Sequence, residues 1–135
     1  MGFLDFLLPR KPKYRNLPES YLEGSDRNLA QDRWVDLEKK LSVGTPSSTR
    51  EAVLEADKVL GYVLEKIYPT GDNFGERLKT AKIKFNGRYD EYDHLWYAHK
   101  IRNEMVHNVN FELPTSQAAD VLGKFKRGLE ILGVL

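Results

Sequence analysis

One short segment of this chain brings an arginine, an amide and a histidine close together. It is Arg102-Asn103-Glu104-Met105-Val106-His107, in a chain of 135 residues with 3 histidines. A guanidinium binds phosphate through two parallel hydrogen bonds, and a histidine accepts and releases protons near neutral pH. The residue types therefore indicate acid–base chemistry at a phosphate. The same side chains can also satisfy one another inside a helical bundle, and the residues alone leave both interpretations open.

Arg102 lies in a helical pattern that we expect from about Tyr89 to Val109. On a wheel of about 100° per residue, Arg102 lies beside the apolar stripe of this helix. A guanidinium keeps its charge, so at such a position it needs an anionic partner. The partner is either a phosphate or the carboxylate of Asp57, at the margin of another apolar stripe. With Asp57, the ion pair would fix the register of two helices and nothing more. The stripe beside Arg102 consists of Leu95, Ala98, Ile101, Met105 and Val109.

His107 lies about 140° around the same wheel from Arg102. Trp96, His99 and Asn103 occupy the arc between them. An aromatic ring bordered by histidine and asparagine is more useful at an interface than in solvent. We therefore expect His99, Asp57 and Trp96 to support a site formed by Arg102, Asn103 and His107. The alternative for His107 is a surface histidine that hydrogen-bonds the last carbonyls of its helix.

A basic run precedes this helix and contains no acidic residue. Placed beside His107, it would guide an RNA backbone; otherwise it is a solvated face. Its members are Lys79, Lys82, Lys84 and Arg88.

Metal and cofactor chemistry is not indicated. His94, His99 and His107 lack the spacing of four residues that places two histidine ligands on one helical face, and the His-Glu-x-x-His pattern is absent. No glycine-rich phosphate loop is present. We expect no metal and no cofactor.

The composition fits one non-secreted domain. Lys plus Arg (21) nearly balances Asp plus Glu (20), so any site for a polyanion must be a local patch. The absence of cysteine excludes disulfides and thiolate chemistry and fits the cytoplasm. No apolar run approaches the roughly 20 residues that span a bilayer.

Residues 1–24 are predicted to form an N-terminal arm. An apolar tip over residues 1–8 is followed by a stretch with three prolines and four basic residues. The prolines prevent a stable helix there. The tip docks onto its own bundle or a partner, inserts into a membrane interface, or is disordered.

Residues 25–135 are predicted to form an all-α, antiparallel bundle of four main helices plus a short one, because the apolar residues repeat at helical spacing and the connections are short. The first helix runs from about Asp26 to Val43, with Ser25 as its cap. The second starts at Ser48, with Glu51 completing a capping box, and ends before Pro69. A short helix from about Phe74 to Lys84 is capped by Asn73 or Asp72, and Asn86-Gly87 forms a turn. The last helix is capped by Thr115 or Ser116 and extends to the C-terminus.

The string from Ala98 to His107, with the short loop and amphipathic helix that follow, resembles HEPN domains. These are small all-α bundles named as nucleotide-binding domains of higher eukaryotes and prokaryotes. Their signature is an arginine, a polar residue directly after it, and a histidine a few residues further on. Arg102, Asn103 and His107 match it. The general layout from about residue 26 onwards is also similar, and the chain resembles short bacterial HEPN-like proteins.

The resemblance implies a metal-independent endoribonuclease in which two copies bring their Arg/His sets into one cleft. His107 would activate the RNA 2′-hydroxyl or protonate the leaving oxygen, Arg102 would stabilise the charge on the phosphorane, and Asn103 would orient both. His99 could be the second proton-transfer group within one chain. A toxin or defence role with an antitoxin-like partner protein fits this class.

Two other functions stay open, because a fold does not carry its function with it. The first is a non-catalytic bundle that acts through protein–protein contacts. The second is a peripheral membrane adaptor that uses residues 1–8.

Overall fold

A computed structural model of the protein describes residues 22–135, which are all helix and connecting loop without a strand. The all-α prediction is thus confirmed for these residues. Most of the predicted arm and its apolar tip lie outside them. The helices are α3 (Gly24–Val43), α4 (Pro46–Ile67), α5 (Phe74–Thr80), the 3₁₀-helix η2 (Ala81–Phe85), α6 (Tyr89–His107) and α7 (Thr115–Ile131).

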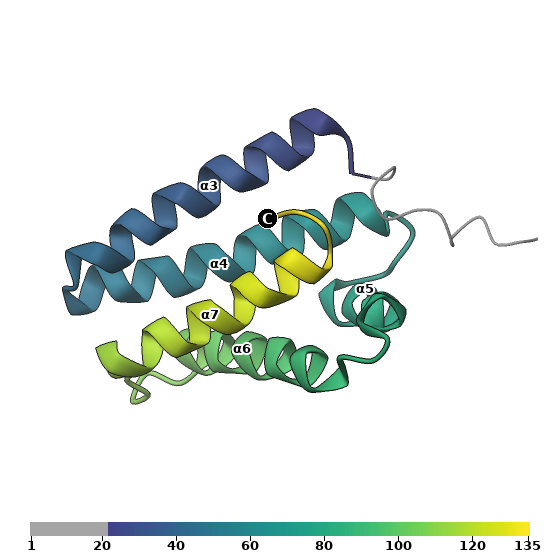
Figure 1. Ribbon diagram of the computed structural model, residues 1–135. Coiled ribbons are helices and arrows are strands. Elements are labelled where there is room, and N and C mark those ends of the chain that lie inside the picture. The colour runs from purple at the N-terminus through teal and green to yellow at the C-terminus, as the bar shows by residue number, and fades with distance from the viewer. Residues whose placement is uncertain (1–21) are drawn as a thin grey trace, which may run out of the picture.

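Four long helices lie along one another, and α5 lies at one end of them (Figure 1). The pair α3 and α4 is antiparallel, since Asp26 bonds Tyr62 near one end while Lys40 pairs with Glu51 near the other. The helices α6 and α7, joined by the loop at residues 108–114, are antiparallel as well (Figure 1).

The helices α4 and α7 run in the same direction, which differs from a purely antiparallel bundle. Both are antiparallel to α6: Arg50 and Asp57 of α4 meet Met105 and His99, and Arg127 of α7 meets Glu91. The reason is that α4 ends and α6 begins at the same end of the bundle, where α5 and η2 connect them, so the chain reverses direction between each long helix and the next (Figure 1).

The core is densest around α4, which contributes the largest set of buried side chains and contacts the three other long helices. Its buried apolar positions follow the helical spacing that the sequence predicted. They are Ala52, Val53, Ala56, Val59, Leu60, Val63, Leu64 and Ile67.

The first two long helices begin earlier than predicted. Ser25 does not cap α3, because the Glu23 carbonyl already accepts from the Arg27 N–H (2.9 Å) and the helix starts at Gly24. In α4 the N-cap is Thr45, whose hydroxyl accepts from the Ser48 N–H (3.1 Å) in a reciprocal capping box. Pro46 then occupies the first helical position, where its fixed φ fits and an N–H is not needed.

The predicted short helix is divided in two. Asn73 caps α5 as expected, accepting from the Glu76 N–H (2.9 Å), but the α-helix stops at Thr80 and continues as η2. Gly87, with φ of 80°, makes the predicted turn before α6.

The ends of the last two helices also differ from the prediction. The helix α6 ends at His107 because Asn108 starts a turn and accepts from the Asn110 N–H (3.0 Å). Val109 is therefore 93% exposed and does not belong to the buried stripe. In α7 the N-cap is Pro114, without a side-chain cap, so neither Thr115 nor Ser116 has that role. This helix ends at Ile131.

Among residues 22–135, we find no helix with the length and apolar character needed to cross a membrane.

Candidate functional site

The centre of the candidate site is Asp57, a buried carboxylate on α4 that faces α6. Its Oδ1 lies 2.8 Å from His99 Nδ1, and its Oδ2 lies 3.3 Å from Arg102 Nε. The Asp57 side chain is only 6% exposed. A buried carboxylate needs such partners because desolvation of an unpaired charge costs several kcal/mol. The pair of Asp57 and Arg102 that the sequence suggested is present.

Asn103 closes these contacts into a ring of four side chains. Its Oδ1 accepts from Arg102 Nη1 (3.1 Å), and its Nδ2 lies 3.3 Å from His99 Nε2. Because the amide nitrogen can only donate, His99 Nε2 is the acceptor. His99 Nδ1 then carries the proton and donates it to Asp57. The ring therefore assigns one tautomer to a neutral His99.

Arg102 is held in this ring and still reaches solvent. Its side chain is 30% exposed, although Asp57 beneath it is buried. The Nε atom is buried and makes no aligned hydrogen bond among the described residues, so its contact with Asp57 is an ion pair without directional geometry. The exposed part of the guanidinium keeps donors for an external anion.

Two aromatic side chains cover His99. The ring of Phe74, the first residue of α5, stacks on it with centroids 4.0 Å apart and 12° between the planes. The ring of Trp96, one turn earlier on α6, makes a T-shaped contact with the His99 ring, with centroids 6.0 Å apart. Trp96 was predicted to support the site, whereas Phe74 was not. No sequence signal identifies Phe74, because its position depends on how α5 crosses α6.

His107 lies outside this ring, at the exposed end of α6. Among the described residues it makes no hydrogen bond or ion pair with Arg102 or Asn103. His99, Asn103 and His107 are spaced by four residues, so they form one stripe with His107 a turn beyond Asn103. Within one chain the structure thus joins Asp57, His99, Arg102 and Asn103 in one ring, and His107 is not part of it.

The basic run does not lie beside His107. Arg88 is the N-cap of α6 and His107 is its last residue, so 19 helical residues, about 28 Å, separate them. Lys79 pairs with Glu76 (3.4 Å), and Lys82 lies over the rings of Tyr89 and Tyr92. The half-buried Lys84 belongs to η2, at the same end of α6 as Arg88. Within one copy of the described chain, the basic run and His107 therefore lie at opposite ends of α6.

A different cation lies near the C-terminal end of α6, the end that carries His107. The guanidinium of Arg50, from the first turns of α4, donates to the Met105 carbonyl (3.0 Å). Sequence reasoning missed it, although Arg50 is seven residues before Asp57 and so lies on almost the same face of α4.

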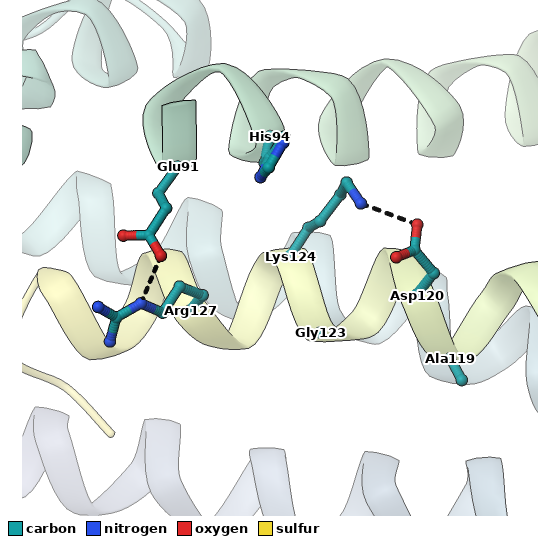
Figure 2. Close-up of a pocket in the computed structure, with 7 residues that line it drawn as sticks. All are labelled: Glu91, His94, Ala119, Asp120, Gly123, Lys124 and Arg127. Atoms are coloured by element: carbon teal, nitrogen blue, oxygen red, sulfur yellow. Dashed lines mark hydrogen bonds and ion pairs between the residues drawn. The ribbon is translucent and has the colours of Figure 1, made fainter. Parts of the chain in front are cut away.

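A shallow groove between α6 and α7 is shown in Figure 2. Its charged side chains are mostly paired: Lys124 with Asp120 (2.8 Å) and Arg127 with Glu91 (2.8 Å). His94 points into the groove from α6. Residues 22–135 contain no group of three or more histidine, cysteine or acidic side chains that could hold a metal ion.

Comparison with known protein families, with curated proteins and with solved structures gave no match to this chain.

Proposed function

We propose that this protein is a metal-independent endoribonuclease with a HEPN-like bundle, in which Arg102 binds the scissile phosphate and His107 transfers protons. One observation carries the proposal: the Arg102 guanidinium is fixed by the buried Asp57, yet 30% of its side chain is exposed. A preorganised cation open to solvent suits an anion that gains charge in the transition state. An arginine needed only for packing has no such requirement.

The reaction follows from the chemistry of RNA. The 2′-oxygen attacks phosphorus and loses its proton to a base; the bond from phosphorus to the 5′-oxygen breaks, and an acid protonates the leaving oxygen. The products are a 2′,3′-cyclic phosphate and a 5′-hydroxyl. Arg102 stabilises the phosphorane, and Asn103, bonded to Arg102 Nη1, holds the guanidinium in place.

Acid–base cleavage uses two proton-transfer groups. His99 is poorly suited to be one of them, because Asp57 and Asn103 occupy both ring nitrogens and Phe74 covers a face. The exposed His107 has neither restriction. We therefore propose a homodimer in which each copy supplies one His107. RNA as substrate also implies the cytoplasm as the compartment.

The second candidate is a non-catalytic bundle that binds a partner protein, such as an antitoxin-like protein. It is favoured by the closed ring, in which Asp57, His99, Arg102 and Asn103 satisfy one another. Exposed Val106 (46%) and Val109 (93%) flank His107 and suit a protein contact.

Incubation of the purified protein with total RNA in a chelator tests the proposal. We expect wild-type cleavage with 2′,3′-cyclic phosphate ends, and loss of cleavage of at least a hundredfold in His107→Gln. His94→Gln is the matched control, since His94 is an exposed histidine facing the groove between α6 and α7. Cleavage by neither protein, or by wild type and His107→Gln equally, would leave the protein-binding function.

A further inference from the structure

The proposed reaction does not use Arg50, although the structure fixes its position. The Arg50 guanidinium donates to the carbonyl of Met105, one of the last four carbonyls of α6. These carbonyls have no donor within their own helix. The bond holds the guanidinium at the end of α6 where His107 lies, while the residue as a whole stays exposed.

In the part of the chain that the structure describes, no carboxylate neutralises the charge of Arg50. Among residues 22–135, Arg50 takes part in no ion pair. The neighbouring acids on α4 are engaged elsewhere, Glu51 with Lys40 (3.9 Å) and Glu55 with Arg33 (3.2 Å). Arg102, in contrast, is compensated by Asp57. A cation at a helix C-terminus is favourable by itself, so capping of α6 is the alternative role for Arg50.

Arg50 and Arg102 lie along the same seam between α4 and α6. Arg50 precedes Asp57, the partner of Arg102, by seven residues on one face of α4, or about 10.5 Å. On α6, the Met105 carbonyl that binds Arg50 belongs to the turn that follows Arg102. The two guanidinium groups therefore follow one another along the seam, and His107 lies on the last turn of α6.

We infer that Arg50 and Arg102 bind two consecutive phosphates of one RNA strand. Arg102 takes the scissile phosphate and Arg50 its neighbour, so the inference rests on the proposed function for the choice of strand. Contacts to phosphates position a nucleic acid without reading its sequence. Arg50 is thus a positioning residue that selects strands with a second phosphate.

Binding of a short DNA strand of RNA-like sequence tests this without cleavage, because DNA lacks the 2′-hydroxyl. The affinity is measured by fluorescence anisotropy over a range of salt concentrations. We expect the slope of log affinity against log salt to fall by roughly 0.7 in Arg50→Gln, as one phosphate contact is lost. Arg50→Lys keeps the charge and should restore the slope. Arg33→Gln is the matched control, because Arg33 already pairs with Glu55.

A second measurement needs no variant. Wild-type protein should bind a strand with two phosphates more tightly than a strand with one, and this advantage should shrink as the salt concentration rises. Equal salt slopes for wild type and Arg50→Gln, equal affinities for the strands with one and two phosphates, or no binding by wild type would overturn the inference. A lower melting temperature of Arg50→Gln with an unchanged slope would identify a cap only. Wild-type protein that binds with these slopes but never cleaves RNA would refute the proposed function and keep the two-phosphate site. Cleavage of RNA by wild-type protein, together with the same salt slope for wild type and Arg50→Gln, would keep the proposed function and refute the two-phosphate site.

Discussion

Removal of the Asp57 carboxylate should destabilise the protein more than any exposed acid does. Asp57→Ala leaves Arg102 without its anion and His99 Nδ1 without its acceptor. Breaking a fully buried pair costs about 3–5 kcal/mol, and this value must be reduced here because the Arg102 side chain is 30% exposed and can be hydrated. The lost hydrogen bond from His99, which is 13% exposed, adds about 1–2 kcal/mol. We expect a total of about 3 kcal/mol.

The assay is urea denaturation followed by circular dichroism, with thermal melting as a second measurement. At about 4 °C per kcal/mol for a domain of this size, the melting temperature should fall by about 12 °C. Asp57→Asn keeps one acceptor oxygen for His99, but it loses the charge and places an NH2 donor opposite Arg102, so it should cost less than Asp57→Ala without restoring stability. Asp32→Ala, an exposed acid on α3, is the control and should stay within about 0.5 kcal/mol. A loss in Asp57→Ala no larger than in Asp32→Ala would refute the reasoning about the ring.

Three further outcomes are expected. Gly128→Ala should lower the free energy of unfolding by about 1 kcal/mol in chemical denaturation, because a Cβ there would lie 2.7 Å from two methyl carbons of Leu95. Gly123→Ala on the same helix meets open space and should raise the free energy of unfolding by about 0.5–1 kcal/mol. Equal effects of the two substitutions would contradict this. Burial raises the pKa of Tyr68 from 10.0 to about 12, so the unfolded chain ionises first and the free energy of unfolding should fall as pH rises from 10 to about 12. Tyr68→Phe should remove this pH dependence and leave the stability at pH 7 unchanged. If the pH dependence is the same in Tyr68→Phe, Tyr68 is not its source. His107→Gln should keep its melting temperature within about 2 °C because His107 is exposed, which separates loss of activity from loss of fold.

The helices could be predicted because their determinants are local. Apolar residues at helical spacing identified the body of every long helix, and Pro69 and Asn86-Gly87 marked breaks correctly. The caps were less predictable, since several nearby residues can each cap a helix. Ser48 and Thr45 both can accept from a backbone N–H, and Pro46 decided between them by fitting the first helical position.

The site was only partly predictable. The wheel showed that Arg102 lies beside the core and needs an anion, and Asp57 was the acid at the right margin. The wheel could not show that Phe74 stacks on His99 or that Arg50 reaches Met105. Those contacts join separate helices, so they depend on crossing angles and on the direction of α4 relative to α6.

The sequence by itself therefore determined the helices, their buried faces and the demand of Arg102 for a negative partner. These follow from the helical repeat and from the cost of burying an unpaired charge. Only the tertiary structure decided that one carboxylate serves both His99 and Arg102, that Asn103 closes the ring, and that the basic run lies a whole helix away from His107. The physical reason is that periodicity fixes which face of a helix is buried, whereas the packing of whole helices fixes what that face meets.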